Sequence, residues 1–298
     1  MTYSIVAYDP QTQEIGVAVQ SRYFAAGRMV PWLEAGVGAV ATQFLANPRY
    51  GYEGLRLLRS GMSAQDALAR LIREDAESAA RQVAIFDAQG RFAQHTGAAC
   101  PAETGQAHGL HCAAQANGMT RNTVWSAMVS AFEQHQGLFA ERLLAALEAA
   151  EQEGGDIRGK QAATLLIASA IPETGSKADY RLDLRIDDHP DPVAELQRLF
   201  AYDRAHRKAG HALEKMARGD IPGAAGDLEA CCVAYPDEPE FLGRYALLLL
   251  ATGRLEEARR MMKRAMSGHP GWGEYLLRMA DTGIYPFTRA MVAPLIQG

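Results

Sequence analysis

Cysteines are few in this chain of 298 residues, and their spacing excludes the common cysteine-based sites. Cys100, Cys112, Cys231 and Cys232 include one adjacent pair and no CxxC motif. Neither a disulfide framework nor a zinc ribbon is indicated by such spacing. The cysteines fit a reducing compartment, and we expect a cytoplasmic protein.

Long apolar runs and nucleotide motifs are also missing. No stretch approaches the ~20 apolar residues that a membrane helix needs, and the first residues lack the features of a signal peptide. The sequence has no GxxxxGK followed by Ser or Thr, and no convincing dinucleotide fingerprint. Its formal net charge of −5 does not favour nucleic acid or an anionic membrane. We therefore expect no cofactor, no nucleic-acid partner and no membrane partner.

The pattern of strands and helices predicts an α+β fold. Residues 3–8 and 14–20 are apolar-rich segments around turn residues, which favours an antiparallel pair. Small residues at 36–44 indicate a third strand, and 46–54 reads as a loop. The order then continues as two helices, strands, two helices and strands. The further helices are expected at 52–61, 63–75, 122–135 and 138–155, and the further strands at 81–97, 109–116, 161–170 and 180–188.

Two helix pairs among antiparallel strands must each cover a sheet. Two packed sheets with helices outside is the natural solution, so residues 1–204 are predicted to form a four-layer αββα sandwich.

From about Ala205 the sequence is helical and repeats with an offset of 34 residues. The matched pairs resemble tetratricopeptide (TPR) repeats in their small residues, turn glycines and closing prolines. We expect a small all-α, TPR-like region over 205–298, with a partial third unit near Trp272. Two and a half repeats are few, which favours packing on the main domain or a partner, and a homodimer. The matched pairs are Ala212 with Ala246, Gly219 with Gly253, Ala224 with Ala258, and Pro236 with Pro270.

Thr2 stands directly before the first predicted strand. A threonine hydroxyl is a weak nucleophile until a base takes its proton, and only an N-terminal residue also carries an α-amine, with a pKa near 8, to act as that base. Removal of Met1 before a small residue would expose both groups. Thr2 is equally readable as an ordinary β-branched residue that starts a strand.

The stretch "TYSIVAYDPQTQEIGVAVQSR" resembles the N-terminal nucleophile (Ntn) hydrolases, and residues 1–200 resemble the domain-of-unknown-function family 1028. The matching stretches include "VPWLEAGVGAVATQ", "ANPRYGYEGL", "HTGAAC", "GGDIRGKQAA" and "RIDDHPDPVAEL". The resemblance implies the αββα fold and a hydrolase. From this we expect an Ntn-like amidohydrolase that acts on a small amide or peptide. Thr2 would be the nucleophile.

Other polar residues are candidates for the same site. Asn117, at a strand-to-helix corner, suits oxyanion binding or a helix cap. Gln20 and Ser21 end the strand that pairs with the first one. Glu34 stands where proteasome-like relatives place a lysine, and this acid is a departure from their pattern. The substrate-binding candidates are Gln20, Ser21, Glu34, Gln43, Asn47 and His95.

Two clusters could bind a metal. The run "DDHPDP" holds Asp187, Asp188, His189 and Asp191, but a turn and cap before a helix is favoured. Cys100, His108, His111 and Cys112 lie in "CPAETGQAHGLHC", whose spacing does not match common zinc sites. We expect no metal. The rival functions are a non-catalytic scaffold that binds a protein partner through its helical repeats, and a metal-dependent hydrolase.

Overall fold

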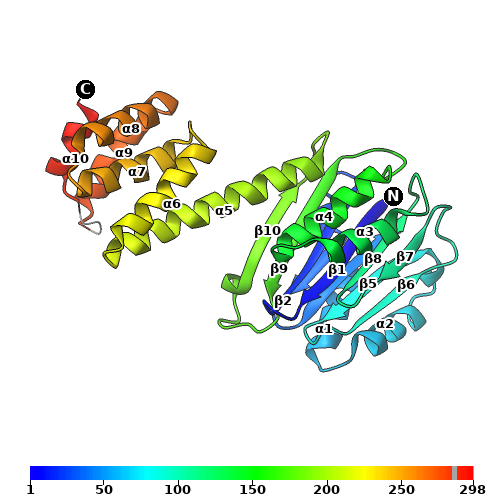
Figure 1. Ribbon diagram of the computed structural model, residues 1–298. Coiled ribbons are helices and arrows are strands. Elements are labelled where there is room, and N and C mark those ends of the chain that lie inside the picture. Colours follow the sequence, from blue (N-terminus) through cyan, green and yellow to red (C-terminus); the bar gives the residue numbers. More distant parts are fainter. Residues whose placement is uncertain (284–286, 298) are drawn as a thin grey trace. The chain divides into compact units, whose positions relative to one another are not determined.

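The computed structural model describes residues 1–283 and 287–297, and the chain divides into two compact units (Figure 1). The first unit runs from Met1 to Phe200 and the second begins at Ala201. The division lies within helix α5 (Pro192–Ala217).

The first unit begins with the expected antiparallel pair. Strand β1 (Thr2–Asp9) pairs with β2 (Glu14–Ser21) along their whole length, from Thr2 opposite Ser21 to Asp9 opposite Glu14. This pair is the centre of a six-stranded sheet, in the order β10-β9-β2-β1-β8-β7. Its other strands are β7 (Gly105–His108), β8 (Cys112–Asn117), β9 (Ala162–Ser169) and β10 (Tyr180–Ile186).

A second sheet has the order β3-β4-β5-β6. The predicted strand at 36–44 is β4 (Gly38–Phe44), and the hairpin at 81–97 is β5 (Arg81–Asp87) with β6 (Phe92–Thr96). Strands β3 (Pro31–Glu34) and β7 are two short edge strands that the sequence reading missed. All neighbouring strands of both sheets are antiparallel, so the expected mixed α+β class is confirmed.

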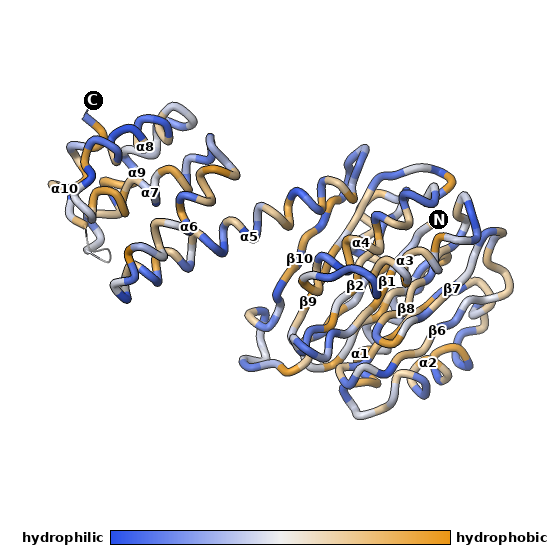
Figure 2. The backbone as a smooth tube through the Cα atoms, in the orientation of Figure 1, coloured by the Kyte–Doolittle hydropathy of each residue, from blue (hydrophilic) through white to orange (hydrophobic). Residues whose placement is uncertain are grey.

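Three apolar cores separate the layers of this unit (Figure 1). Helices α3 (Val124–Gln134) and α4 (Phe139–Gln152) pack on the outer face of the six-stranded sheet. Helices α1 (Pro48–Arg59) and α2 (Ala64–Arg73) pack on the outer face of the four-stranded sheet. The third core, with Val6, Val17 and Phe86, lies between the sheets. Along α2, Figure 2 shows alternating hydrophilic and hydrophobic colour, as expected for a helix with one buried face.

The predicted loop at 46–54 is wrong over most of its length, because α1 already begins at Pro48. Asn47 is its N-cap and accepts a hydrogen bond from the Arg49 backbone N–H. Proline at the first helical position and an Asn cap are a standard helix start, which the aromatic and glycine residues after Pro48 obscured.

The second unit is helical in its described residues. Helix α6 (Ile221–Ala234) and helix α8 (Leu255–Gly268) begin and end 34 residues apart. The repeat alanines Ala212, Ala224, Ala246 and Ala258 are completely buried, as close helix packing requires. The remaining helices are α7 (Pro239–Ala251), α9 (Gly271–Asp281), which contains Trp272, and α10 (Arg289–Ile296).

Among the described residues, no helix combines the length and apolar character that spanning a bilayer would require.

Each unit has its own apolar cores, which predicts that the first unit folds alone. A chain ending at residue 204 should unfold cooperatively in urea when followed by circular dichroism. A broad, non-cooperative transition would contradict the prediction.

The turn before β10 is organised by the buried carboxylate of Asp179. This carboxylate accepts hydrogen bonds from the backbone N–H groups of Glu173, Thr174 and Ser176 and from the Thr174 hydroxyl. Burial alone would raise the pKa of Asp179, but these donors hold it at about 2. The carboxylate thus contributes stability above its unfolded pKa of about 4, and this contribution is lost as the pH falls towards 2.

Replacement Asp179→Asn should therefore destabilise the protein at pH 6, and the difference from the unchanged protein should narrow at pH 3. Urea unfolding at pH 6 and at pH 3 measures the difference in the free energy of unfolding between the two proteins. A difference that is the same at the two values would show that Asp179 is not the titrating group.

Candidate active site

Three strand ends meet at Thr2. Thr2 begins β1, opposite Ser21 at the end of β2 and Asn117 at the end of β8. Its side chain faces the space between the sheets, as do those of Ser21 and Asn117, because alternate residues of a strand share a face. Thr2 is 7% exposed. Its Oγ1 lies 2.9 Å from Ser21 Oγ. The structure thus brings together three of the residues that the sequence nominated.

The carbonyl of Met1, next to Thr2, is held by two donors. Ser21 Oγ donates to this oxygen at 2.7 Å, and Arg158 Nη2 donates to it at 2.6 Å. Since the single Ser21 proton is used in this bond, the Thr2 hydroxyl donates to Ser21 Oγ. The Met1 carbonyl oxygen therefore lies together with its two donors, from Ser21 and Arg158, and the Thr2 hydroxyl. We call this group of residues the Thr2 corner.

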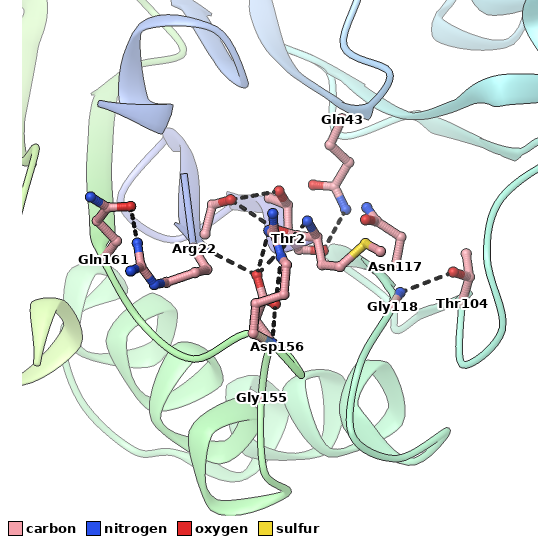
Figure 3. A network of polar contacts seen from close by, with 12 residues as sticks. Thr2, Arg22, Gln43, Thr104, Asn117, Gly118, Gly155, Asp156 and Gln161 are labelled. Carbon is pink, nitrogen blue, oxygen red and sulfur yellow. Dashed lines mark hydrogen bonds and ion pairs between the residues drawn. The ribbon is translucent and has the colours of Figure 1, made fainter. Parts of the chain in front are cut away.

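A buried carboxylate, Asp156, lies under this corner (Figure 3). It accepts hydrogen bonds from the Arg22 backbone N–H at 3.0 Å and from Arg158 Nη2 at 2.9 Å. The Met1 ammonium is 3.9 Å from its Oδ2. The pKa of this amine is lowered, first by burial, with Asp156 raising it and Arg158 lowering it. Burial therefore favours the neutral form of the Met1 amine relative to a solvent-exposed one.

Gly118 follows Asn117 and completes the wall of the corner. Its φ of +61° lies in the left-handed region, and a Cβ atom there would come within 2.5 Å of the Met1 side chain. Its N–H is bound by Thr104 Oγ1 at 3.1 Å (Figure 3). The lack of a side chain at Gly118 therefore leaves room for the Met1 side chain.

A buried polar network lies between the sheets behind Thr2. Gln43 Nε2 is 3.1 Å from the Thr2 carbonyl and 2.8 Å from Gln82 Oε1, and Gln43 Oε1 accepts from Ser4 Oγ at 2.7 Å. Asn117 Nδ2 donates to Gln82 Oε1 at 3.0 Å. The network fixes the strand that carries Thr2, and it engages one of the two N–H donors of the Asn117 amide.

Gln20 lies on the other face of the sheet. It pairs in register with Tyr3, whose side chain belongs to the core beneath α3 and α4. Tyr3 is fully buried and its hydroxyl donates to Glu151. The amide of Gln20 is buried there without a hydrogen-bond partner among the described residues. It shares a sheet with Thr2 but does not face the Thr2 hydroxyl.

Glu34 is also distant from Thr2. It ends β3 opposite Gly38, five residues along β4 from Gln43, which corresponds to about 17 Å. There the Arg59 guanidinium donates to its carboxylate. The structure does not bring this acid to the corner.

His95 and Asn47 are held elsewhere by backbone groups. His95 pairs with Val83, whose side chain lies in the α1–α2 core, and its Nε2 is 2.9 Å from the Ser78 carbonyl. The Asn47 side chain caps α1. Neither makes a hydrogen bond to the Thr2 network among the described residues.

Asp156, Arg158 and Gln82 are the residues that sequence reasoning missed. The first two lie in "GGDIRGK", a stretch noted above only for its family resemblance. The sequence does carry a signal for Gln82. It lies two and four residues before Ala84 and Phe86, so it shares their buried face, where a polar side chain is unusual.

The two suggested metal clusters are dispersed. Asp191 pairs with Lys160, Asp188 accepts from Gln161, and the Cys112 thiol is buried, which raises its pKa to about 12. In the part of the chain that the structure describes, no group of three or more His, Cys, Asp or Glu side chains is arranged to hold a metal ion.

The fold and the corner define a class: two packed antiparallel sheets covered by helices, with a strand-end threonine between a serine, an arginine and a buried carboxylate. The chain belongs to the family of unknown function DUF1028, whose model matches residues 2–196. A search of curated proteins found no match.

A solved structure of the same family agrees with this assignment. The chain is similar to a crystal structure of a Silicibacter pomeroyi protein of the same family, with 32% identity and a TM-score of 0.61, covering 67% of this chain and 88% of that one. A second structure, Anbu (ancestral beta-subunit) from Yersinia bercovieri, has 10% identity and a TM-score of 0.34, covering 68% of this chain and 95% of that one.

The network predicts a large cost for replacing Gln43. Gln43→Leu would leave the Ser4 hydroxyl and Gln82 Oε1 with fewer partners in a buried layer, so the free energy of unfolding should fall by about 2–4 kcal/mol. The exposed replacement Gln136→Leu is the control, expected within about 0.5 kcal/mol. Urea unfolding followed by circular dichroism measures both. Equal stability of the two variants would rule out a structural role for the network.

Proposed function

We propose that this protein is an N-terminal nucleophile amidohydrolase that acts on a small amide or peptide. Thr2 attacks the substrate carbonyl once it is the first residue of the chain. The observation that carries the proposal is the Met1 carbonyl held by Ser21 and Arg158 beside the Thr2 hydroxyl. A site that holds one acyl oxygen with two donors can hold the oxygen of a substrate in the same place.

The chemistry follows from the neighbours of Thr2. Burial lowers the pKa of the Met1 amine beside Asp156 and Arg158. Once Met1 is removed, the proposal places the Thr2 amine next to the same two residues, where burial acts on it in the same direction. The neutral amine takes the Thr2 hydroxyl proton as Oγ1 attacks the carbonyl carbon. The proton then passes to the leaving nitrogen, an acyl ester forms on Thr2, and water releases the acid.

The proposal assigns some residues of the expected site to other roles than the sequence suggested. Ser21 and Arg158 replace Asn117 as donors to the oxyanion, because they hold the Met1 carbonyl oxygen, whereas the Asn117 amide donates to Gln82 Oε1. Asn117 and Gln43 act as positioning residues that fix β8 and β1. Glu34, Asn47, His95 and Gln20 take no part in the reaction.

The fold supports the same proposal. The helix–sheet–sheet–helix layers of the first unit have the arrangement expected of Ntn hydrolases, with Thr2 at the start of a central strand. The second unit is proposed to be TPR-like because its helices recur with a 34-residue period.

A scaffold function is the second candidate. In the second unit a groove of 540 Å³ is lined mainly by apolar side chains, including Leu247, Trp272 and Tyr275. Such a groove favours binding of a protein segment through the helical repeats, alongside or in place of catalysis.

The test begins with a screen of small amides and short peptides on protein that begins at Thr2. Thr2→Ala should lower kcat/KM by at least about 10³-fold, because the attacking oxygen is lost. Thr2→Ser should keep measurable activity, since hydroxyl and amine both remain. Thr12→Ala, an exposed threonine in the β1–β2 turn, is the matched control and should leave activity unchanged.

Three outcomes would count against the proposal. An activity unchanged in Thr2→Ala excludes Thr2 as nucleophile, and one abolished by a chelator favours the metal-dependent rival. A protein inert towards every amide, with circular dichroism showing it folded, favours the scaffold function.

A further inference from the structure

A second pocket, of 450 Å³, opens between the edge strands of the two sheets. Strand β3 is the edge of the four-stranded sheet and β10 the edge of the six-stranded sheet. Two hydrogen bonds hold β10 in place here, one to β3 and one to the short turn Ala26–Arg28. The Tyr180 hydroxyl donates to the Leu33 carbonyl at 2.7 Å, and Arg185 Nη1 donates to the Gly27 carbonyl at 2.8 Å. All four residues line the pocket, so its walls are fixed by direct bonds.

One part of the pocket lining depends on a close backbone approach at Gly27. A Cβ atom on Gly27 would lie 2.2 Å from Thr164 Oγ1 of β9, so only glycine allows the short turn Ala26–Arg28 to sit on this strand. The turn places Arg28 in the pocket wall. On the other side, the turn bound by Asp179 carries Lys177, which also lines the pocket.

The charges of the lining are unbalanced. Arg28, Lys177 and Arg185 face one carboxylate, Asp183. Asp183 accepts from Arg185 Nε at 2.6 Å, so these two neutralise one another. Arg28 and Lys177 are exposed and make no ion pair with any described residue. Two unpaired cations at one pocket of a chain with net charge −5 attract a small anion.

The rest of the lining is apolar. Pro31 and Leu33 of β3 and Leu166 of β9 belong to the pocket, and both leucines are buried. The ligand that fits therefore has an anionic head and a short apolar body.

We propose that this pocket binds a small organic carboxylate, with the carboxylate between Arg28 and Lys177 and the apolar body against Leu33 and Leu166. The site is separate from the Thr2 corner. Leu166 pairs with Val17, four residues along β2 from Ser21, which corresponds to about 13 Å along the strand. The proposal thus stands or falls independently of catalysis by Thr2.

Isothermal titration calorimetry on the full chain tests it, with octanoate as the probe and octan-1-ol and inorganic phosphate as comparisons at fixed ionic strength. The double variant Arg28→Gln/Lys177→Gln removes both cations. The control Arg73→Gln/Lys263→Gln makes the same charge change at exposed positions outside the pocket lining. Circular dichroism verifies that both variants are folded.

Saturable 1:1 binding of octanoate is expected in the unchanged protein and the control, weakened by at least about tenfold in Arg28→Gln/Lys177→Gln. Octan-1-ol and phosphate should each bind more weakly than octanoate, because each lacks one half of the recognised chemistry. The proposal is overturned if octanoate does not bind at millimolar concentration, if the double variant binds it as the control does, or if either comparison compound binds as tightly.

Discussion

The buried carboxylate of Asp156 is the interaction on which the Thr2 corner depends. It binds the backbone after β2 through Arg22 N–H, and it orients Arg158, which in turn holds the Met1 carbonyl. A buried carboxylate needs such partners, since its desolvation is costly without them. One side chain from the segment after α4 thereby connects the end of β2 to the start of β1.

The space between the sheets has an apolar part and a polar part, which follow one another along the strands. Away from Thr2 it is filled by apolar residues such as Val17 and Phe86, whereas near Thr2 it holds amides and hydroxyls. The apolar part provides the stability that lets the polar part be fully buried. Buried amides such as those of Gln43 and Gln82 restrict the strands to one register, because a slip would leave them unpaired.

The sequence predicts the framework of this fold well and its site only in part. Apolar-rich runs next to turn residues locate β1, β2 and β5, and Ser63, the N-cap residue, locates the start of α2. Short edge strands such as β3 carry too few residues for a periodic signal.

The candidate site residues also differ in how well the sequence predicts them. Ser21 and Asn117 follow from strand ends that lie next to Thr2, whereas Gln20 fails because adjacent strand residues face opposite sides. Asp156 reaches the corner from a turn 134 residues beyond Arg22, and no local pattern encodes such a distant contact.

The account centres on Thr2 as an N-terminal nucleophile, and the identity of the first residue tests that most directly. Mass spectrometry of the N-terminal peptide, from protein purified from its native cells, should find Thr2 first, with a free α-amine. Retention of Met1, or a blocked Thr2 amine, would contradict the account, because the base of the proposed reaction would then be missing.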